Sequence, residues 1–399
     1  MKLKQIFLGL IISFVTFSVL FVLGEFWVRN FVLINRTTGV CEEPDPILKA
    51  RPIADSTCFS QTPEWKVINS HNSFGLRGPE TTLEKPEGVY RVLFLGDSFA
   101  YGFGVEEANS FPRLVEKGLN EVFNGQPRIE VINAGIPGFS SILEYLYLKN
   151  EGFKFNPDLV ILEFDLTDFS NDFTYTADAV FDGSGIPIAV PPESSIAAET
   201  VAVAGPRPAS QPDAQTMQKH QLLPFVPSNI KKFFHDHSIL YRWVSTQFKV
   251  MLGQPLADSE VESIGSFYTI VKEDTSNDEV LWQAPRKNIA LMNDFLAEKG
   301  IPFVVSAHPQ GILVDGEEWS NGRLLHGLEQ HKIYSDRYFS QMGDFLKSKS
   351  IPFINLLPYF RQSGVRGMFF PFDGHFNENG HKVAAEGIVA ELLKMEIIK

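Results

Sequence analysis

Cysteine is almost absent from this chain, which has two, Cys41 and Cys58, among 399 residues. No further cysteine or histidine pair lies near them at the spacing of metal ligands, so they do not form a zinc-type site. In an oxidising compartment the two thiols could close a short loop, worth about 3 kcal/mol in the chain-entropy model. Two free thiols are the alternative, and the sequence leaves both open.

Basic residues are also scarce. The chain has 35 Lys and Arg against 48 Asp and Glu, a net charge of −13, and they form no basic stripe. Binding to phosphates requires clustered lysines and arginines, which excludes nucleic acid as the expected partner. The acidic surplus suits solubility. Internal repeats are absent too, and the 44% hydrophobic content is typical of a globular protein with a substantial core.

One long apolar run lies near the N-terminus. Residues 6–23 are apolar apart from two serines and a threonine, just long enough to cross a bilayer. Lys2 and Lys4 precede the run, and Trp27 follows where an interfacial aromatic would lie. No small-residue cleavage site follows. We therefore expect residues 1–35 to be an uncleaved single-pass anchor in the cell membrane, with the remaining chain outside the cytoplasm; a cleaved signal peptide is the alternative.

Residues 36–88 are rich in turn-forming residues, and we expect an extended linker and N-terminal segment there. Arg77 stands out in it because Gly75 and Gly78 flank it. On a turn, such an arginine either binds an anion or donates to nearby backbone carbonyls.

Residues 89–399 show apolar runs that alternate with helical patterns. The expected strands are Tyr90–Leu95, Ile129–Ala134, Leu159–Phe164, Pro302–Ala307 and Pro352–Leu357, and the expected helices lie near 111–124, 140–152, 281–299, 336–348 and 379–394. This alternation predicts the α/β class, a doubly wound parallel sheet of five strands in three layers. Residues 174–280 interrupt the pattern and are expected to be an insertion: a lid, a docking surface or a passive loop.

Ser98 follows the first of these runs, in the sequence Gly96-Asp97-Ser98. Open α/β sheets bind ligands at this carboxyl edge, but a serine becomes nucleophilic only when a base takes its proton. Asp373 and His375 supply a candidate pair, because residues i and i+2 of an extended loop point to the same side. Asp373 could hold Nδ1 of His375 and leave Nε2 for Ser98. His381 is the alternative base.

Two further polar segments follow the second and third runs. Gly135 follows the second, within Asn133–Gly138, and a glycine there can bring a backbone N–H close to an oxyanion. Thr167 and Asn171 lie after the third run in Asp165–Asp172, whose polar donors suit the same task. The alternatives are a plain turn for the first segment and a helix cap for the second.

Together these four blocks resemble the SGNH (GDSL-type) hydrolase superfamily, over about residues 72–395 without most of the insertion. The resemblance implies a flavodoxin-like fold, a catalytic triad of Ser98, His375 and Asp373, and an oxyanion hole containing the backbone N–H groups of Ser98 and Gly135. Two features depart from the family. The histidine block reads Asp-x-His where Asp-x-x-His is commoner. The third block, usually Gly-x-Asn-Asp, reads Asp-Leu-Thr-Asp, so Thr167 stands where the family has its oxyanion asparagine, with Asn171 as a substitute donor.

We therefore expect a membrane-anchored serine esterase that needs no cofactor or metal and acts on O-acyl esters of a small molecule or polysaccharide. One alternative is an O-acyltransferase of envelope or exported polysaccharide. A second is a catalytically impaired domain that binds carbohydrate or lipid. A third is a metal-dependent hydrolase, whose candidate ligands are Asp97, Asp168, His308, Asp373 and His375.

Overall fold

The computed structural model describes residues 41–62, 64–192, 269–326 and 328–398, with a few positions near the N-terminus (5, 13, 16 and 18–24). The chain divides into two units. The first, Met1–Arg36 with Ala197–Leu256, lies almost wholly outside the described residues, and so does the predicted anchor. Among the described residues, no helix has the length and apolar character needed to cross a bilayer. The second unit, Thr37–Ile196 with Ala257–Lys399, is the subject below.

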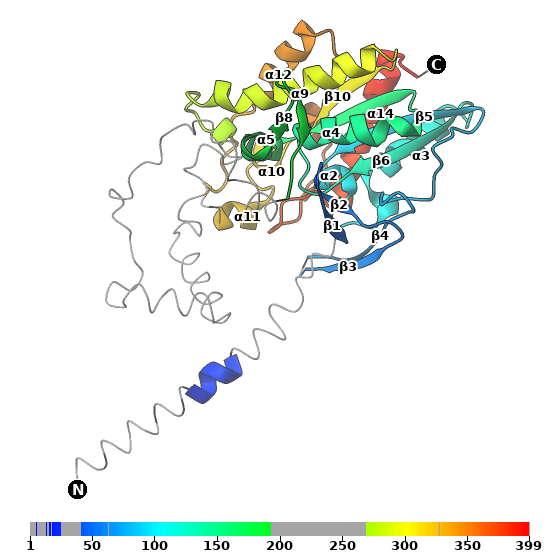
Figure 1. Cartoon of the computed structure of the whole chain (residues 1–399). Helices are drawn as coiled ribbons and strands as arrows, with labels where there is room; N and C mark the ends of the chain where they lie inside the picture. The colour runs from blue at the N-terminus through cyan, green and yellow to red at the C-terminus, as the bar shows by residue number, and fades with distance from the viewer. Residues whose placement is uncertain are drawn as a thin grey trace. The chain divides into compact units, whose positions relative to one another are not determined.

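A five-stranded parallel sheet forms the centre of this unit (Figure 1), in the order β11-β10-β7-β5-β6. The strands are β5 (Val89–Gly96), β6 (Arg128–Gly135), β7 (Leu159–Phe164), β10 (Phe303–Ala307) and β11 (Phe353–Asn355). Each predicted apolar run is one of these strands, so the α/β prediction is confirmed. Every residue of β7 is buried, as expected for a strand covered on both faces.

Helices cover the sheet in two layers. They are α3 (Phe111–Val122), α4 (Ser141–Asn150), α5 (Leu166–Asp178), α9 (Asp278–Ala297), α12 (Arg337–Ser348) and α14 (Glu378–Met395). The chain moves from β5 outward to β6, then returns past β5 to β7. Because such crossovers are right-handed, α3 and α4 lie on opposite faces. Helix α14 packs against α3, whereas α4 and α5 pack against α9. The direction reverses at β5, the switch point where open sheets bind ligands.

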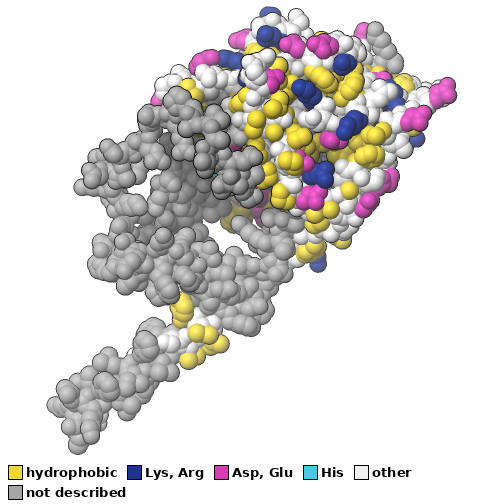
Figure 2. Space-filling model, in the orientation of Figure 1, with side chains coloured by type: hydrophobic (Ala, Val, Ile, Leu, Met, Phe, Trp, Pro, Cys, Tyr) yellow, Lys and Arg dark blue, Asp and Glu magenta, His cyan; other side chains and the backbone are white. Residues whose placement is uncertain are grey.

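Short elements connect these helices and strands. They are α2 (Ser98–Tyr101), η2 (Glu107–Asn109), η3 (Gly152–Phe155), η4 (Thr269–Val271), α10 (Gly311–Val314), α11 (Ser320–Leu325) and α13 (Leu357–Gln362). The surface face in Figure 2 shows basic side chains interspersed with acidic and apolar ones over the described residues, rather than gathered in a stripe.

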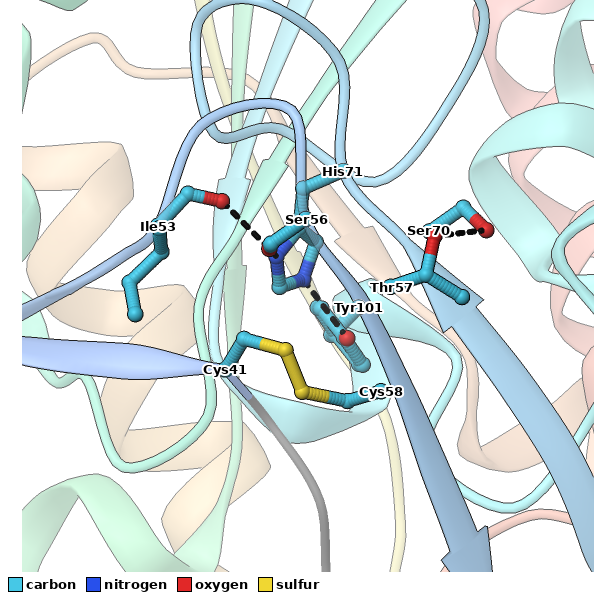
Figure 3. The surroundings of a disulfide bond; sticks show 8 residues. All are labelled: Cys41, Ile53, Ser56, Thr57, Cys58, Ser70, His71 and Tyr101. Carbon is cyan, nitrogen blue, oxygen red and sulfur yellow. Dashed lines mark hydrogen bonds between the residues drawn. A yellow bond between two sulfur atoms is a disulfide. The ribbon is translucent and has the colours of Figure 1, made fainter.

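The expected linker at 36–88 is more structured than its composition indicates. It contains two antiparallel hairpins, β1 (Glu42–Asp45) with β2 (Lys49–Pro52) and β3 (Thr57–Gln61) with β4 (Lys66–Ser70). A disulfide joins Cys41 to Cys58, with Cα atoms 5.7 Å apart, and so ties the start of β1 to β3 (Figure 3). Of the two states left open for these cysteines, the structure has the bonded one.

The predicted insertion at 174–280 is too wide at both ends. Helix α5 continues to Asp178 and is followed by a hairpin of β8 (Val180–Phe181) and β9 (Pro187–Ala189), whereas α9 already begins at Asp278. Helix α5 begins with a capping box formed by Asp165 and Asp168. The Asp165 side chain accepts the Thr167 N–H, and the Asp168 side chain accepts the Asp165 N–H. Residues 193–268 lie outside the described part of the chain.

Candidate active site

Ser98 lies at the tight turn between β5 and α2. Asp97 caps this short helix, and its Oδ1 accepts the Phe99 N–H at 2.7 Å. The turn requires Gly96, because a Cβ atom at that position would lie 2.7 Å from the Cβ atom of Ala100. The strand therefore delivers the Ser98 side chain to the carboxyl edge of the sheet, beside the switch point.

The structure brings Ser98, His375 and Asp373 together in the order that the sequence predicts. Ser98 Oγ lies 2.7 Å from Nε2 of His375, and Nδ1 of His375 is hydrogen-bonded to Oδ1 of Asp373. The same carboxylate oxygen accepts the backbone N–H of His375 at 3.2 Å. Phe99 and Phe103 pack on the imidazole, with ring centroids 4.7 and 5.0 Å away. The ring is thus held in one orientation, with one nitrogen directed at each partner.

The charge of Asp373 sets the protonation of this histidine. Burial alone lowers the pKa of His375, but the charge of Asp373 and its hydrogen bond outweigh burial and raise the pKa above 6.5. In the neutral form, Nδ1–H donates to Asp373 and Nε2 accepts the proton of Ser98. This is the tautomer that a general base for the serine requires.

His381, the alternative base, has a different environment. Its Nδ1 accepts the Phe111 N–H at 3.2 Å, and its ring stacks on that of Phe111. Burial, reinforced by the positive charge of Arg77, lowers the pKa of His381 well below the usual value. His381 therefore joins α14 to α3 as a neutral, buried side chain, and it is His375 that reaches Ser98.

Gly135, predicted as an oxyanion donor, already uses its N–H. That group donates to Asn133 Oδ1 at 3.0 Å, and Asn133 Nδ2 donates in turn to the Ala100 carbonyl at 2.8 Å. A Cβ atom on Gly135 would lie 2.4 Å from the Tyr101 nitrogen. The glycine therefore lets α2 approach β6 closely, and the N–H predicted to face a ligand is bonded to Asn133 in this structure.

Gly138, three residues further on, has the features expected of Gly135. It is exposed, it has a positive φ of 77°, and its N–H makes no hydrogen bond within the described residues. Its carbonyl accepts the hydroxyl of Tyr175 at 2.8 Å, which fixes the loop. The sequence analysis missed this residue, although it is the second glycine of the same block. Gly138 is thus the better candidate for a backbone donor after β6.

Thr167, at the family's asparagine position, also has its donor occupied. Its Oγ1 lies 2.6 Å from Asp165 Oδ1 and 3.3 Å from Asp97 Oδ2. A hydroxyl has one proton, and the nearer carboxylate takes it. Thr167 therefore lies beside the nucleophile turn, but it would have to rotate away from Asp165 to stabilise an oxyanion.

Asn171 lies on the same face of α5 as two residues that border the site. Thr167 and Tyr175 are each four residues from it, a spacing that shares one face of a helix. Thr167 contacts Asp97, next to the serine, and Tyr175 contacts Gly138. The half-buried Asn171 lies between them and has no hydrogen bond among the described residues. Its amide is a free donor at this edge of the sheet.

Six carboxylates are buried near this site: Asp97, Glu144, Glu163, Asp165, Asp168 and Asp172. Burial and the neighbouring negative charges raise the pKa of Asp97, Glu144 and Asp168 well above their usual values, and burial raises that of Asp172 to about 6. Among the described residues, neither carboxylate oxygen of Glu144 has a hydrogen-bond partner. Burial thus favours the protonated forms of Asp97, Glu144, Asp168 and Asp172 relative to exposed carboxyls.

His308 forms an ion pair within this group, with Nε2 at 2.8 Å from Glu163 Oε1. Its Nδ1 lies 3.1 Å from the Pro309 carbonyl. Burial alone lowers the pKa of His308, but Glu163 outweighs it and raises the pKa to about 9. His308 is one of the candidate ligands of the metal-dependent alternative; in the described part of the chain, no cluster of three or more His, Cys, Asp or Glu is arranged to hold a metal ion.

The chain was compared with known proteins. No family model matches it, and no curated protein matches it either. Among solved structures it is similar to a lipolytic protein of the G-D-S-L family from Desulfitobacterium hafniense DCB-2, with 11% identity, a TM-score of 0.34, and coverage of 75% of this chain and 98% of that one. It is also similar to a lipase/acylhydrolase from Enterococcus faecalis (14% identity, TM-score 0.37, coverage 77% and 96%). An acetyl xylan esterase gives 13% identity, a TM-score of 0.34, and coverage of 76% and 99%.

Proposed function

We propose that the chain is a serine esterase of the SGNH type that hydrolyses O-acyl esters. The observation that supports it most is the 2.7 Å contact between Ser98 Oγ and His375 Nε2, with Asp373 on the opposite nitrogen. His375 takes the proton as Ser98 attacks the ester carbonyl, and then gives that proton to the departing alkoxide. Water, deprotonated by the same imidazole, attacks the acyl-serine and releases the carboxylic acid and the free enzyme.

Backbone N–H groups at the carboxyl edge stabilise the oxyanion in this proposal. Ser98 is the first residue of α2, and the first N–H groups of a helix have no partner within the helix. The Gly138 N–H is the second donor, and the Asn171 amide replaces the family's asparagine. Each such donor is worth about 3–4 kcal/mol of transition-state stabilisation.

The location and the substrate belong to the same proposal. The apolar run at 6–23 and the Cys41–Cys58 disulfide support a domain attached to the membrane and facing an oxidising compartment. An ester hydrolase in that place would act on O-acyl groups of an envelope or exported polysaccharide, or on small esters. Transfer of the acyl group to an acceptor hydroxyl uses the same acyl-serine, so an O-acyltransferase differs only in the second step.

A second candidate is a binding domain that has lost turnover. It is favoured by two donors that are already occupied, the Gly135 N–H on Asn133 and the Thr167 hydroxyl on Asp165. In this case the site would bind an acylated carbohydrate or lipid without cleaving it.

Hydrolysis of p-nitrophenyl acetate by the wild-type chain, Ser98→Ala and Ser348→Ala separates these candidates. Ser348 is an exposed serine of α12 that bonds only to its own helix, so its replacement is the matched control. The esterase proposal requires turnover that Ser98→Ala removes, that Ser348→Ala keeps, and that EDTA leaves unchanged. Wild-type activity no higher than that of Ser98→Ala would contradict it and favour the binding domain. Loss of activity in EDTA would favour the metal-dependent alternative.

A further inference from the structure

The turn of the β3–β4 hairpin contacts the loop that carries the candidate catalytic acid. Glu64 lies in this turn, and its two carboxylate oxygens each accept one backbone N–H. Oε1 accepts that of Phe372 and Oε2 that of Asp373, both at 2.9 Å. A carboxylate that binds two adjacent N–H groups fixes both the position and the orientation of that peptide segment. The second of these groups belongs to Asp373 itself.

Trp65, the next residue, joins the hairpin to both catalytic loops. Its ring centroid lies 4.7 Å from that of Phe370 and 5.5 Å from that of Phe103. Phe370 precedes Asp373 by three residues, and Phe103 follows the helix that begins at Ser98. Trp65, Val67, Val105 and Phe370, with Phe103 against them, form an apolar cluster separate from the main core.

Gly104 shows how closely this cluster is packed. A Cβ atom at Gly104 would lie 2.6 Å from Phe370 and 3.2 Å from Trp65, and the residue has a positive φ of 86°. The chain after the nucleophile helix therefore passes directly against the hairpin and the Asp373 loop.

The hairpin itself is anchored on both sides. Cys58 in β3 is bonded to Cys41, and Figure 3 shows this disulfide near His71, whose Nε2 lies 2.9 Å from the Tyr101 hydroxyl. Further along, the buried Arg77 donates to three carbonyls at the end of α2 and just beyond it, those of Tyr101, Gly102 and Val105, at 3.0, 2.6 and 2.6 Å. The sequence left two roles open for Arg77, binding of an anion and donation to nearby backbone carbonyls. The structure shows the second. The segment expected to be a linker thus holds the turn of Ser98 as well as the loop of Asp373.

We infer that Glu64 is a positioning residue for the catalytic acid, and that the β3–β4 hairpin aligns the Asp373–His375 loop with Ser98. The inference rests on the proposed esterase function. Glu64 accepts two backbone N–H groups of this loop, and this role needs no contact with a substrate. It acts by fixing the Asp373 backbone, from which the carboxylate reaches Nδ1 of His375. A displacement of that loop by 1 Å lengthens the contact of His375 with Ser98, and misplacements of this size cost about 10²-fold in rate.

The test compares Glu64→Ala and Glu64→Gln with the wild-type chain on p-nitrophenyl acetate, with the full chain in detergent. Glu43→Ala is the control, because Glu43 is in the neighbouring hairpin and, within the described part of the chain, its side chain bonds to Arg51 alone. We expect Glu64→Ala to lower kcat by about 10–100-fold with KM within about twofold, since positioning affects the reaction step more than binding. Glu64→Gln keeps one acceptor oxygen and falls between Glu64→Ala and the wild type. Glu43→Ala is unchanged.

The kcat and KM values distinguish positioning from a merely structural role. If Glu64→Ala lowers the melting temperature while the folded enzyme keeps the wild-type kcat, or if Glu64→Gln and Glu64→Ala both keep it, the inference is wrong. Should Glu64→Ala fail to fold, the kcat of Glu64→Gln decides. Ser98→Ala is measured in parallel. Turnover that depends on Ser98 but not on Glu64 overturns this inference alone. If no turnover depends on Ser98, the proposed function is overturned as well.

Discussion

Ser98 Oγ and His375 Nε2 lie 2.7 Å apart, although 277 positions separate them in the sequence. The first follows β5 and the second lies in the loop before α14, and both come to the carboxyl edge of the parallel sheet. The contact gives the serine a base, and the base has its own carboxylate partner.

Replacement of Asp373 by Asn tests the protonation of His375. Activity requires neutral His375, whose pKa the Asp373 charge raises above 6.5, so kcat/KM should rise with pH through that raised pKa. Asp373→Asn removes the charge, moves this acid limb to lower pH, and lowers kcat by up to about 10⁴-fold. The kcat/KM profile from about pH 5 to 9 measures both effects. An acid limb at the same pH in the variant would contradict the assignment.

Gly138→Ala and Thr167→Val test which groups stabilise the oxyanion. Gly138 has a φ of 77°, so an alanine there strains the loop and displaces the N–H; we expect kcat to fall about tenfold or more. The Thr167 hydroxyl already donates to Asp165, so Thr167→Val should change kcat by less than about threefold. Steady-state kinetics on one ester measure both. The reverse order of effects would assign the donor role to Thr167.

The buried His308–Glu163 ion pair is expected to contribute strongly to stability. His308→Gln leaves the Glu163 carboxylate without its cation and should cost about 3–5 kcal/mol in the free energy of unfolding. The double variant with Glu163→Gln should recover part of this loss. Because the pKa of His308 is raised to about 9, its contribution is complete below pH 6.5 and disappears as the pH rises through 9. Urea unfolding at a series of pH values checks this, and equal losses at about pH 6 and about pH 10 would contradict it.

Glu144→Gln should stabilise the protein at alkaline pH. Burial raises the pKa of Glu144 well above 4.5, so this group opposes folding increasingly as the pH rises from 4.5 through the raised pKa. Gln removes the ionisation and has nearly the same shape. We expect a higher melting temperature at about pH 8, by about 2–4 °C for each kcal/mol gained, and little change at about pH 4. The exposed Glu121→Gln is the control for loss of one charge. A gain that is the same at both pH values would be inconsistent with this explanation.

The sheet and the proximity of Ser98, His375 and Asp373 were predictable because each depends on a local pattern. A strand buried on both faces is a continuous apolar run, and β5, β6 and β7 show this plainly. The Asp373–His375 pair follows from a spacing of two in an extended loop. The parallel sheet then places the ends of all strands at one edge, which brings Ser98 close to that pair.

The remaining features depend on which side chain occupies which donor, and no local pattern encodes that. Gly135 ends β6 and Gly138 lies three residues later, and within the described residues it is the Asn133 side chain that occupies the N–H of the first. Glu64 bonds to backbone groups 308 and 309 positions away, in a segment whose turn-rich composition predicted a linker. His308 comes directly after β10, at the edge of the sheet where metal ligands and catalytic residues are expected. Its partner, Glu163, lies on another strand, β7.

The central claim is that Ser98 is a nucleophile activated by His375. The most direct test is reaction of the intact protein with a fluorophosphonate probe, followed by mass spectrometry to locate the modified residue, for the wild-type chain and His375→Gln. The account predicts one phosphonylated residue, Ser98, whose labelling slows by about 10³-fold or more without the base. A Ser98 side chain that stays unlabelled, or that reacts equally fast in His375→Gln, would contradict it.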